Sequence, residues 1–158
     1  MALRPVVLPP DIPGTLWLSS MPGRQDAWES FEAEARRAGL ALIVCLTPLR
    51  EVAELSPEYR AALAQSRLPC RWLNLPIPNF GLPHDLPMFR REIGQIGDEL
   101  RAGRAVMLHC AAGLGRTGTA AACVLKALGL PEAEALGRVR EAGSNPQNAS
   151  QSGLVGWF

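Results

Sequence analysis

The chain has 158 residues, of which 47% are hydrophobic and 20% are charged, and its formal net charge is +1. This length and composition predict one globular domain spanning residues 1–158. The near-neutral charge argues against a nucleic-acid partner or binding to an anionic membrane, since both depend on a strong positive field.

The start of the chain lacks the apolar core of a signal peptide, and no apolar run is long enough to cross a bilayer. We therefore expect a cytoplasmic protein with no membrane partner. The four cysteines, at positions 45, 70, 110 and 123, do not show the paired spacing of a metal site. The sequence predicts no metal, no cofactor and no disulfide framework.

The first part of the chain predicts an extended arm, a strand and a helix. Several prolines in residues 5–14 favour a surface arm, which leads to a short strand at 15–19. A helix is expected to follow, with Asp26 as its N-cap and Gly39 after its last turn. Its apolar face would consist of Trp28, Phe31, Ala35 and Ala38.

The next segments continue the alternation of strands and helices. Residues 40–46 are continuously apolar, which is typical of a strand buried on both faces. Residues 49–66, interrupted by Pro57, predict two short helices, and residues 71–77 predict another strand.

In the second half, Asp85 is positioned to cap an amphipathic helix over residues 86–100. An apolar strand at 105–108 follows, then a loop and a helix-forming run, and Pro131 opens a further helix to about residue 142. Residues 143–151 are expected to form a polar loop before a short apolar tail. The pattern predicts an α/β fold with a mostly parallel central sheet of four to five strands flanked by helices, and a site at the carboxyl ends of the strands.

Residues 109–118 carry the chemistry, because they connect the strand at 105–108 to a helix. A loop that enters a helix N-terminus leaves backbone N–H groups without intrahelical partners, and these groups together with the helix dipole bind anions. The same field favours the thiolate form of Cys110, which is the nucleophilic form. Arg116 offers a planar fork of donors that suits two oxygens of a phosphoryl group.

The sequence HCAAGLGRTG at these positions resembles the signature loop of the cysteine-dependent protein phosphatases, and most closely that of their dual-specificity branch. The resemblance implies a tyrosine or dual-specificity protein phosphatase that forms a phosphocysteine intermediate on Cys110. Its substrate would be a phosphorylated protein or a small phosphate ester. Thr117 would support the cysteine when the phosphoenzyme breaks down, and His109 would orient the loop. The phosphate would be held by Ala111, Ala112, Gly113, Leu114, Gly115 and Arg116.

One position departs from the family pattern. Residues 76–81 (PIPNFG) resemble the family's acid loop, with Asn79 where the catalytic aspartate belongs. A neutral amide does not donate a proton efficiently, and a general acid contributes about 10²–10⁴ in rate. Either Asp85 replaces the acid in addition to its role in capping, or the substrate has a leaving group of low basicity. A phenolate has a pKa near ~10 and a phosphate leaving group one near ~6, so phosphotyrosine-like esters and anhydrides fit best.

The sequence leaves alternatives for the glutamines at 147 and 151, for Cys45 and for the function. Gln151 fits the family's water-positioning glutamine better than Gln147 does, although either could be a solvated polar residue. Cys45 could form a reversible disulfide with Cys110, or could be a buried apolar side chain. The alternatives to a monoester phosphatase are a catalytically weak phosphate-binding pseudophosphatase and a phosphoanhydride hydrolase that resembles an RNA 5′-triphosphatase.

Overall fold

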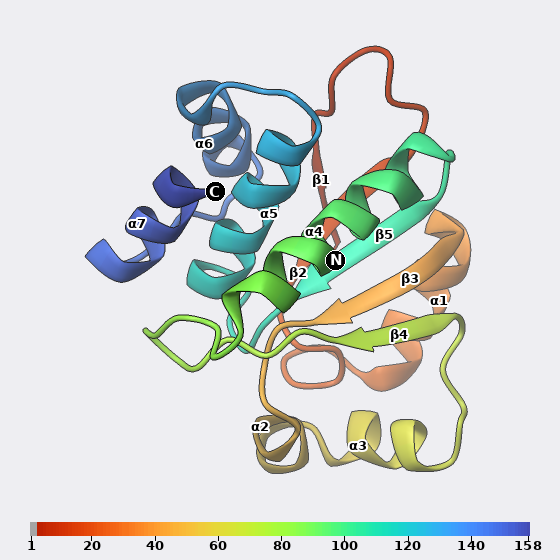
Figure 1. The fold of residues 1–158 in the computed structure, drawn as a ribbon. Coiled ribbons are helices and arrows are strands. Elements are labelled where there is room, and N and C mark those ends of the chain that lie inside the picture. Colours follow the sequence, from red (N-terminus) through yellow and green to blue (C-terminus); the bar gives the residue numbers. More distant parts are fainter. Residues whose placement is uncertain (1–2) are drawn as a thin grey trace.

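The computed structural model describes residues 3–158, which form a five-stranded sheet between two layers of helices (Figure 1). The strands are β1 (Arg4–Val6), β2 (Thr15–Ser19), β3 (Leu40–Cys45), β4 (Arg71–Asn74) and β5 (Ala105–His109). They lie in the order β1-β2-β5-β3-β4, with only β1 antiparallel to its neighbour. The prediction of an α/β fold with a mostly parallel sheet of four to five strands is confirmed.

The start of the chain differs from the expected surface arm. Arg4 pairs with Leu18 and Val6 with Leu16, so β1 adds an antiparallel edge to the sheet. The prolines of this segment obscured the strand in the sequence. An edge strand tolerates Pro5, because one side of such a strand has no ladder of hydrogen bonds to complete.

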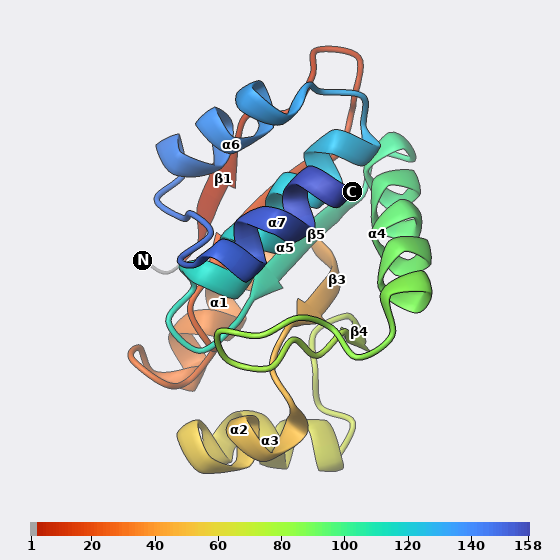
Figure 2. The same cartoon turned by 60° about the vertical axis from the view of Figure 1, so that its left-hand side comes forward.

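Four helices cover one face of the sheet: α4 (Leu86–Arg101), α5 (Gly115–Ala127), α6 (Glu132–Glu141) and α7 (Ala149–Trp157). Figure 2 shows α7 lying over α5 on the side away from the sheet. Of the 13 residues of α5, 11 are buried, because the helix is enclosed by the sheet and by the three other helices. Its run of small residues allows this close packing on every side. Within residues 3–158, no helix has the length and apolarity needed to span a membrane.

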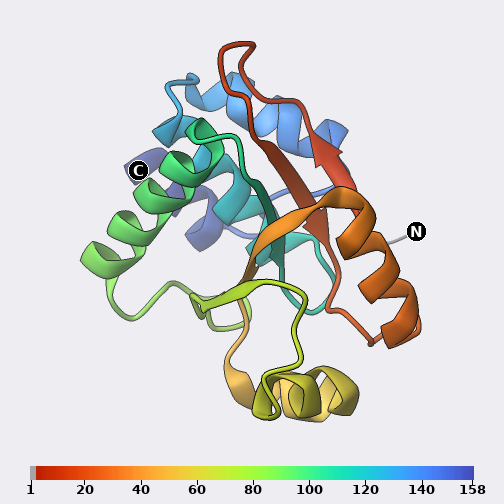
Figure 3. The same ribbon diagram turned by 90° about the vertical axis from the view of Figure 1, so that its right-hand side faces the viewer.

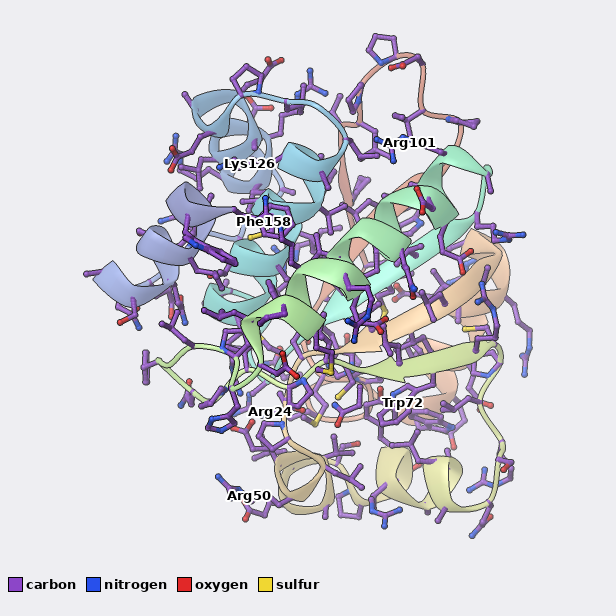
Figure 4. All side chains as sticks on the ribbon, in the orientation of Figure 1. Arg24, Arg50, Trp72, Arg101, Lys126 and Phe158 are labelled. Atoms are coloured by element: carbon purple, nitrogen blue, oxygen red, sulfur yellow. The ribbon has the colours of Figure 1, made fainter. Side chains whose placement is uncertain are left out.

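The opposite face carries α1 (Trp28–Ala38), α2 (Leu49–Leu55) and α3 (Pro57–Ala64). Figure 3 shows α1 and α4 on opposite sides of the strands. The core on this face includes Trp28 and Tyr59, whose rings stack with centroids 5.6 Å apart. In Figure 4, Trp72 extends from β4 toward α3, where its indole N–H donates to the Tyr59 hydroxyl.

Several element boundaries match the sequence and others do not. The two short helices in residues 49–66 and the cap by Asp85 are confirmed. Asp26 is not the cap of α1, because the N-cap is Ala27 and no side chain bonds there. The strand predicted at 71–77 is shorter and ends at Asn74.

The polar loop predicted for residues 143–151 is also partly wrong, because α7 begins at Ala149 and continues through the expected apolar tail. Asn148 caps it by accepting a hydrogen bond from the Gln151 N–H at 2.9 Å. Only Leu154 and Val155 supply the buried apolar contacts of this short helix, which is too few for a periodic pattern in the sequence.

The register of the three central strands positions the site. Ser19 of β2 and Cys45 of β3 both lie opposite His109, the last residue of β5. The three parallel strands therefore end in line, and the loop after β5 begins between the segments that follow β2 and β3. This is the edge of a parallel sheet at which α/β proteins bind ligands.

Candidate active site

The loop after β5 curls inward because donors outside it hold its carbonyl oxygens outward. The N–H and C=O of a trans peptide point in opposite directions, so each outward carbonyl turns the following N–H toward the inside of the loop. The donors are the N–H groups of Leu46 to the His109 oxygen (2.9 Å), of Met21 to the Ala111 oxygen (3.1 Å) and of Asn145 to the Leu114 oxygen (3.2 Å).

The Gly113 carbonyl is held by two side chains. Arg4 Nη2 donates to this oxygen at 2.6 Å, and Ser144 Oγ donates to it at 2.6 Å. Gly113 has a φ of +78°, and a Cβ at this position would lie 2.6 Å from the Ser19 carbonyl oxygen. Only glycine fits such a turn against a neighbouring backbone. Sequence analysis missed both Arg4 and Ser144.

A hollow of about 310 Å³ opens at this loop. Of the predicted site residues, it brings together Cys110, Arg116, Asn79, Gln151 and the predicted phosphate-holding residues other than Gly113, whereas Thr117 and His109 do not line it. Asp85 is not among the residues that line the hollow. It is exposed, and its Oδ1 accepts a hydrogen bond from the Met88 N–H at 2.9 Å as the cap of α4. The lining residues are Arg24, Glu51, Leu55, Asn79, Phe80, Cys110, Ala111, Ala112, Leu114, Gly115, Arg116, Gln147 and Gln151.

Cys110 is 3% exposed, and its sulfur accepts a hydrogen bond from the Gly113 N–H at 3.2 Å. The helix α5 starts directly after the loop, with Leu114 at the N-cap and no side-chain cap bond. The first-turn N–H groups of α5 are therefore free of side-chain acceptors and lie at the positive end of the helix dipole. This environment favours a bound anion.

Arg116 is held in the wall of the hollow by a carboxylate. The Arg116 guanidinium is 4% exposed and donates to both Glu51 oxygens, at 2.6 and 3.4 Å, and to the Ile77 carbonyl at 3.2 Å. Glu51 comes from α2, on the other side of the sheet from α5. Sequence analysis missed it, because one glutamate on a short polar helix carries no distinguishing signal.

A chain of hydrogen bonds holds the His109 ring in position. Trp72 Nε1 donates to the Tyr59 oxygen at 2.9 Å, the Tyr59 hydroxyl lies 2.8 Å from His109 Nε2, and His109 Nδ1 lies 3.0 Å from the Cys110 carbonyl oxygen. A carbonyl only accepts, so His109 Nδ1 carries a proton and donates to the Cys110 oxygen. Burial, reinforced by the charge of Cys45, raises the pKa of Tyr59 and keeps this phenol protonated.

The other three cysteines differ in their acidity. Burial raises the pKa of Cys70 to about 11 and that of Cys123 to about 12. For Cys45, burial acts to raise the pKa, but the nearby His109 and the hydrogen bonds to Thr47 outweigh it, so the pKa is lowered. All four thiols are free within the described chain.

Thr117 and Gln151 lie beside the loop with polar groups still available. The Thr117 hydroxyl is fully buried and has no hydrogen-bond partner among residues 3–158. Gln151 is 2% exposed, and its Oε1 accepts from the Gln147 N–H at 2.8 Å. Its amide NH₂ group remains free of that bond at the edge of the hollow.

Solved structures share this fold. Kinase-associated phosphatase with serine in place of its catalytic-site cysteine has a TM-score of 0.81 and 20% identity, over 97% of this chain and 90% of its own. Tk-PTP in its active form has a TM-score of 0.72 and 25% identity, over 94% and 95%. The human tyrosine phosphatase-like serine/threonine/tyrosine-interacting protein has a TM-score of 0.70 and 21% identity, over 98% and 93%.

No curated protein sequence is detectably similar to this chain. Residues 12–152, however, match the family model described as "PTP-SAK: Swiss Army Knife protein, DSP-PTPase phosphatase domain". The match includes four of the five strands and the whole segment from His109 to Gly118. The chain therefore belongs to this family of dual-specificity-type phosphatase domains.

Proposed function

We propose that the chain is an active phosphatase that hydrolyses phosphate monoesters through a phosphocysteine intermediate on Cys110. The observation that carries the proposal is the hollow that joins the Cys110 sulfur, the Arg116 guanidinium and the inward N–H groups of the loop. We further propose that residues 1–158 act as one catalytic domain. A thiolate nucleophile requires a compartment that keeps thiols reduced, so we expect the cytoplasm.

In the first step the Cys110 thiolate attacks the phosphorus atom, the S–P bond forms and the P–O ester bond breaks. The electron pair of that bond leaves with the departing oxygen. The N–H groups of the loop and of the start of α5 donate hydrogen bonds to the three phosphoryl oxygens. Arg116 donates to two of these oxygens. These donors stabilise the charge that spreads over the equatorial oxygens in the transition state.

In the second step a water molecule attacks the phosphocysteine, the S–P bond breaks and dihydrogen phosphate leaves. Thr117 has a buried hydroxyl with no other partner in the described chain, and it can donate to the sulfur as the thiolate re-forms. The free amide of Gln151 borders the hollow, where it can orient the attacking water.

The composition of the hollow supports aryl substrates. Its only carboxylate is Glu51, which is engaged by Arg116, so no described lining residue is an obvious proton donor to a basic leaving group. A phenolate leaves with less need of an acid than an alkoxide does. Phe80, next to Asn79 at the rim, is 61% exposed and offers an apolar face to an aryl ring.

The backbone at Phe80 supports a functional role for this aromatic side chain. Phe80 has a φ of +58°, a left-handed conformation that is unfavourable for a bulky residue. Its carbonyl accepts a hydrogen bond from Asn148 Nδ2 at 3.2 Å, and the Gly81 N–H closes the turn on the Pro78 oxygen. Strained residues of this kind cluster at functional sites.

A binding module is the second candidate, and Asn79 is the observation that favours it. Loss of the acid would leave the phosphate cradle intact while it slows turnover. The human tyrosine phosphatase-like protein of similar fold is named as an interacting protein. The Cys110 nucleophile, Arg116 and Thr117 all remain in this chain, and they favour the enzyme.

The decisive experiment compares 4-nitrophenyl phosphate, an alkyl phosphate and pyrophosphate as substrates for wild type, Cys110→Ser and Asn79→Asp. We expect turnover of the aryl ester by wild type and none by Cys110→Ser. Asn79→Asp should improve the alkyl phosphate most and add a basic limb to its pH–rate profile. Tungstate binding without turnover of any substrate would establish the binding module, and selective turnover of pyrophosphate would establish the anhydride hydrolase.

A further inference from the structure

Two side chains from distant segments of the chain, Arg4 and Ser144, hold the Gly113 carbonyl. We propose that Arg4, in the first strand of the sheet, is a positioning residue for the phosphate cradle: together with Ser144 it locks the Gly113 carbonyl outward, so that the Leu114 N–H faces the bound phosphoryl group. The inference rests on the proposed function, and it adds a residue that lies more than one hundred positions before the loop.

The geometry of one peptide unit carries this proposal. Arg4 Nη2 and Ser144 Oγ both donate to the Gly113 oxygen at 2.6 Å, and together they occupy both of its acceptor positions. The Gly113–Leu114 peptide is planar and trans, so fixing its oxygen outward fixes the Leu114 N–H in the opposite direction. Leu114 lines the hollow and is the N-cap of α5, so that N–H points to the anion side.

Arg4 is itself held rigidly. Its Nη1 donates to the Ala142 carbonyl at 2.7 Å and to Ser144 Oγ at 3.0 Å, so the guanidinium bridges the loop and the segment after α6. A Cβ at Gly143 would lie 2.7 Å from Arg4 Nη1, which shows how closely the backbone there approaches the guanidinium. A lysine has no planar fork and could not make these three bonds in the same arrangement.

Arg4 also carries a charge that no carboxylate cancels. Arg116 is paired with Glu51, whereas Arg4 forms no ion pair within residues 3–158 and donates only to carbonyl and hydroxyl oxygens. Gly113 connects Arg4 to the nucleophile, because its carbonyl accepts from Arg4 Nη2 at 2.6 Å and its N–H donates to the Cys110 sulfur at 3.2 Å. Arg4 therefore contributes a second positive charge that favours the Cys110 thiolate.

The two contributions can be separated with four variants: Arg4→Met, Arg4→Lys, Ser144→Ala and the control Arg138→Met. Arg138 is a suitable control because it donates to the Val7 carbonyl beside the same strand but does not line the hollow. For each variant, three quantities are measured: the tungstate dissociation constant, the pH midpoint of Cys110 alkylation by iodoacetamide, and the kcat/KM for 4-nitrophenyl phosphate. Thermal unfolding checks that each variant is folded.

We expect Arg4→Met to weaken tungstate binding and kcat/KM about tenfold each, as for one lost hydrogen bond, and to raise the alkylation midpoint. Arg4→Lys should restore the midpoint but not the tungstate affinity. Ser144→Ala should weaken tungstate binding without moving the midpoint, and it tests the lock even if Arg4→Met does not fold.

Two results would overturn the inference. One is an Arg4→Met protein whose tungstate dissociation constant is within twofold of that of Arg138→Met and whose alkylation midpoint lies at the same pH. The other is a Ser144→Ala protein that keeps wild-type tungstate affinity. Failure of the proposed function looks different, because wild type would then bind tungstate without turnover, and the Arg4 effect on binding would still be measurable.

Discussion

The guanidinium of Arg116 and the carboxylate of Glu51 form a two-point ion pair in the wall of the hollow, with N–O distances of 2.6 and 3.4 Å. Glu51 supplies the counter-charge of Arg116 before any phosphate arrives. A phosphoryl dianion that binds to Arg116 then comes close to the Glu51 carboxylate, so the same residue that orients the arginine also opposes the anion.

This relationship predicts that Glu51→Gln is less stable but gains more from phosphate than wild type does. The variant leaves a buried guanidinium without a counter-charge, which we expect to lower the free energy of unfolding by about 2 kcal/mol. An added anion would restore that charge, so phosphate should stabilise the variant more than wild type. Urea unfolding with and without phosphate measures both effects. Glu54→Gln, an exposed position on the same helix, is the control, and an equal loss there would refute the role of Glu51.

Asp85 should act as a cap alone. Its Oδ1 accepts a hydrogen bond from the Met88 N–H, and its side chain does not line the hollow. We expect Asp85→Ala to lower the free energy of unfolding by about 1 kcal/mol, while Asp85→Asn stays near wild type, since asparagine also caps helices. The pH–rate profiles of all three proteins should be the same, with no basic limb due to a general acid. A basic limb that is present in wild type and absent in Asp85→Asn would instead identify Asp85 as the replacement acid.

Thr117 should control the second chemical step. Replacing it with valine keeps the volume but removes the hydroxyl, so the sulfur loses a donor as it becomes a thiolate. We expect phosphoenzyme breakdown to slow by roughly 10- to 100-fold, which corresponds to one hydrogen bond to a charged group. Stopped-flow measurements with 4-nitrophenyl phosphate should then show a burst of phenolate, whereas Thr117→Ser should resemble wild type. Slower phenolate release without a burst would assign Thr117 to the first step.

The ion pairs of Glu99, which lie away from the site, predict that the free energy of unfolding depends on pH. Burial acts to raise the pKa of Glu99, but the hydrogen bonds from Arg71 and Arg104 and their charges lower it below the ordinary value of 4.5. A depressed folded-state pKa means that the contribution of Glu99 is complete above 4.5 and disappears as the pH falls through the lower value. Both arginines are more than half exposed, so the contribution should stay below about 1 kcal/mol.

The check is to measure the free energy of unfolding for wild type and Glu99→Gln from pH 7 down to pH 3. Wild type should be the more stable protein at pH 7, and the difference should shrink in the acid range. Glu92→Gln, on the same helix and without an ion pair in the described chain, should show no such trend. A difference between wild type and Glu99→Gln that does not change with pH would show that packing, and not charge, accounts for the loss.

The parts of the fold and site that the sequence predicted depend on local patterns. The continuous apolar run of β3, the amphipathic face of α4 and the Asp85 cap are each encoded within a few residues. The loop from His109 to Gly118 is likewise contiguous, so its nucleophile, arginine and glycine turn are visible in one stretch of sequence.

The parts that sequence analysis missed depend on contacts between distant segments. Glu51 meets Arg116 across 65 positions, and Tyr59 meets His109 across 50. Each is an ordinary residue in its own helix, and its role appears only when the sheet aligns the ends of β2, β3 and β5. Arg4 and the helix α7 are further examples, because a proline-rich start and a polar run before the last helix obscured them.

The bond between Arg4 and the Ala142 carbonyl joins two segments that lie 138 positions apart in the chain. Contacts of such long range form late in folding, because ordering the intervening chain is entropically costly until the sheet exists to bring the segments together. A folding chain can therefore complete its strands and helices before the anion-binding loop acquires its final shape. We expect the capacity to bind an oxyanion to be among the last native properties to emerge during refolding.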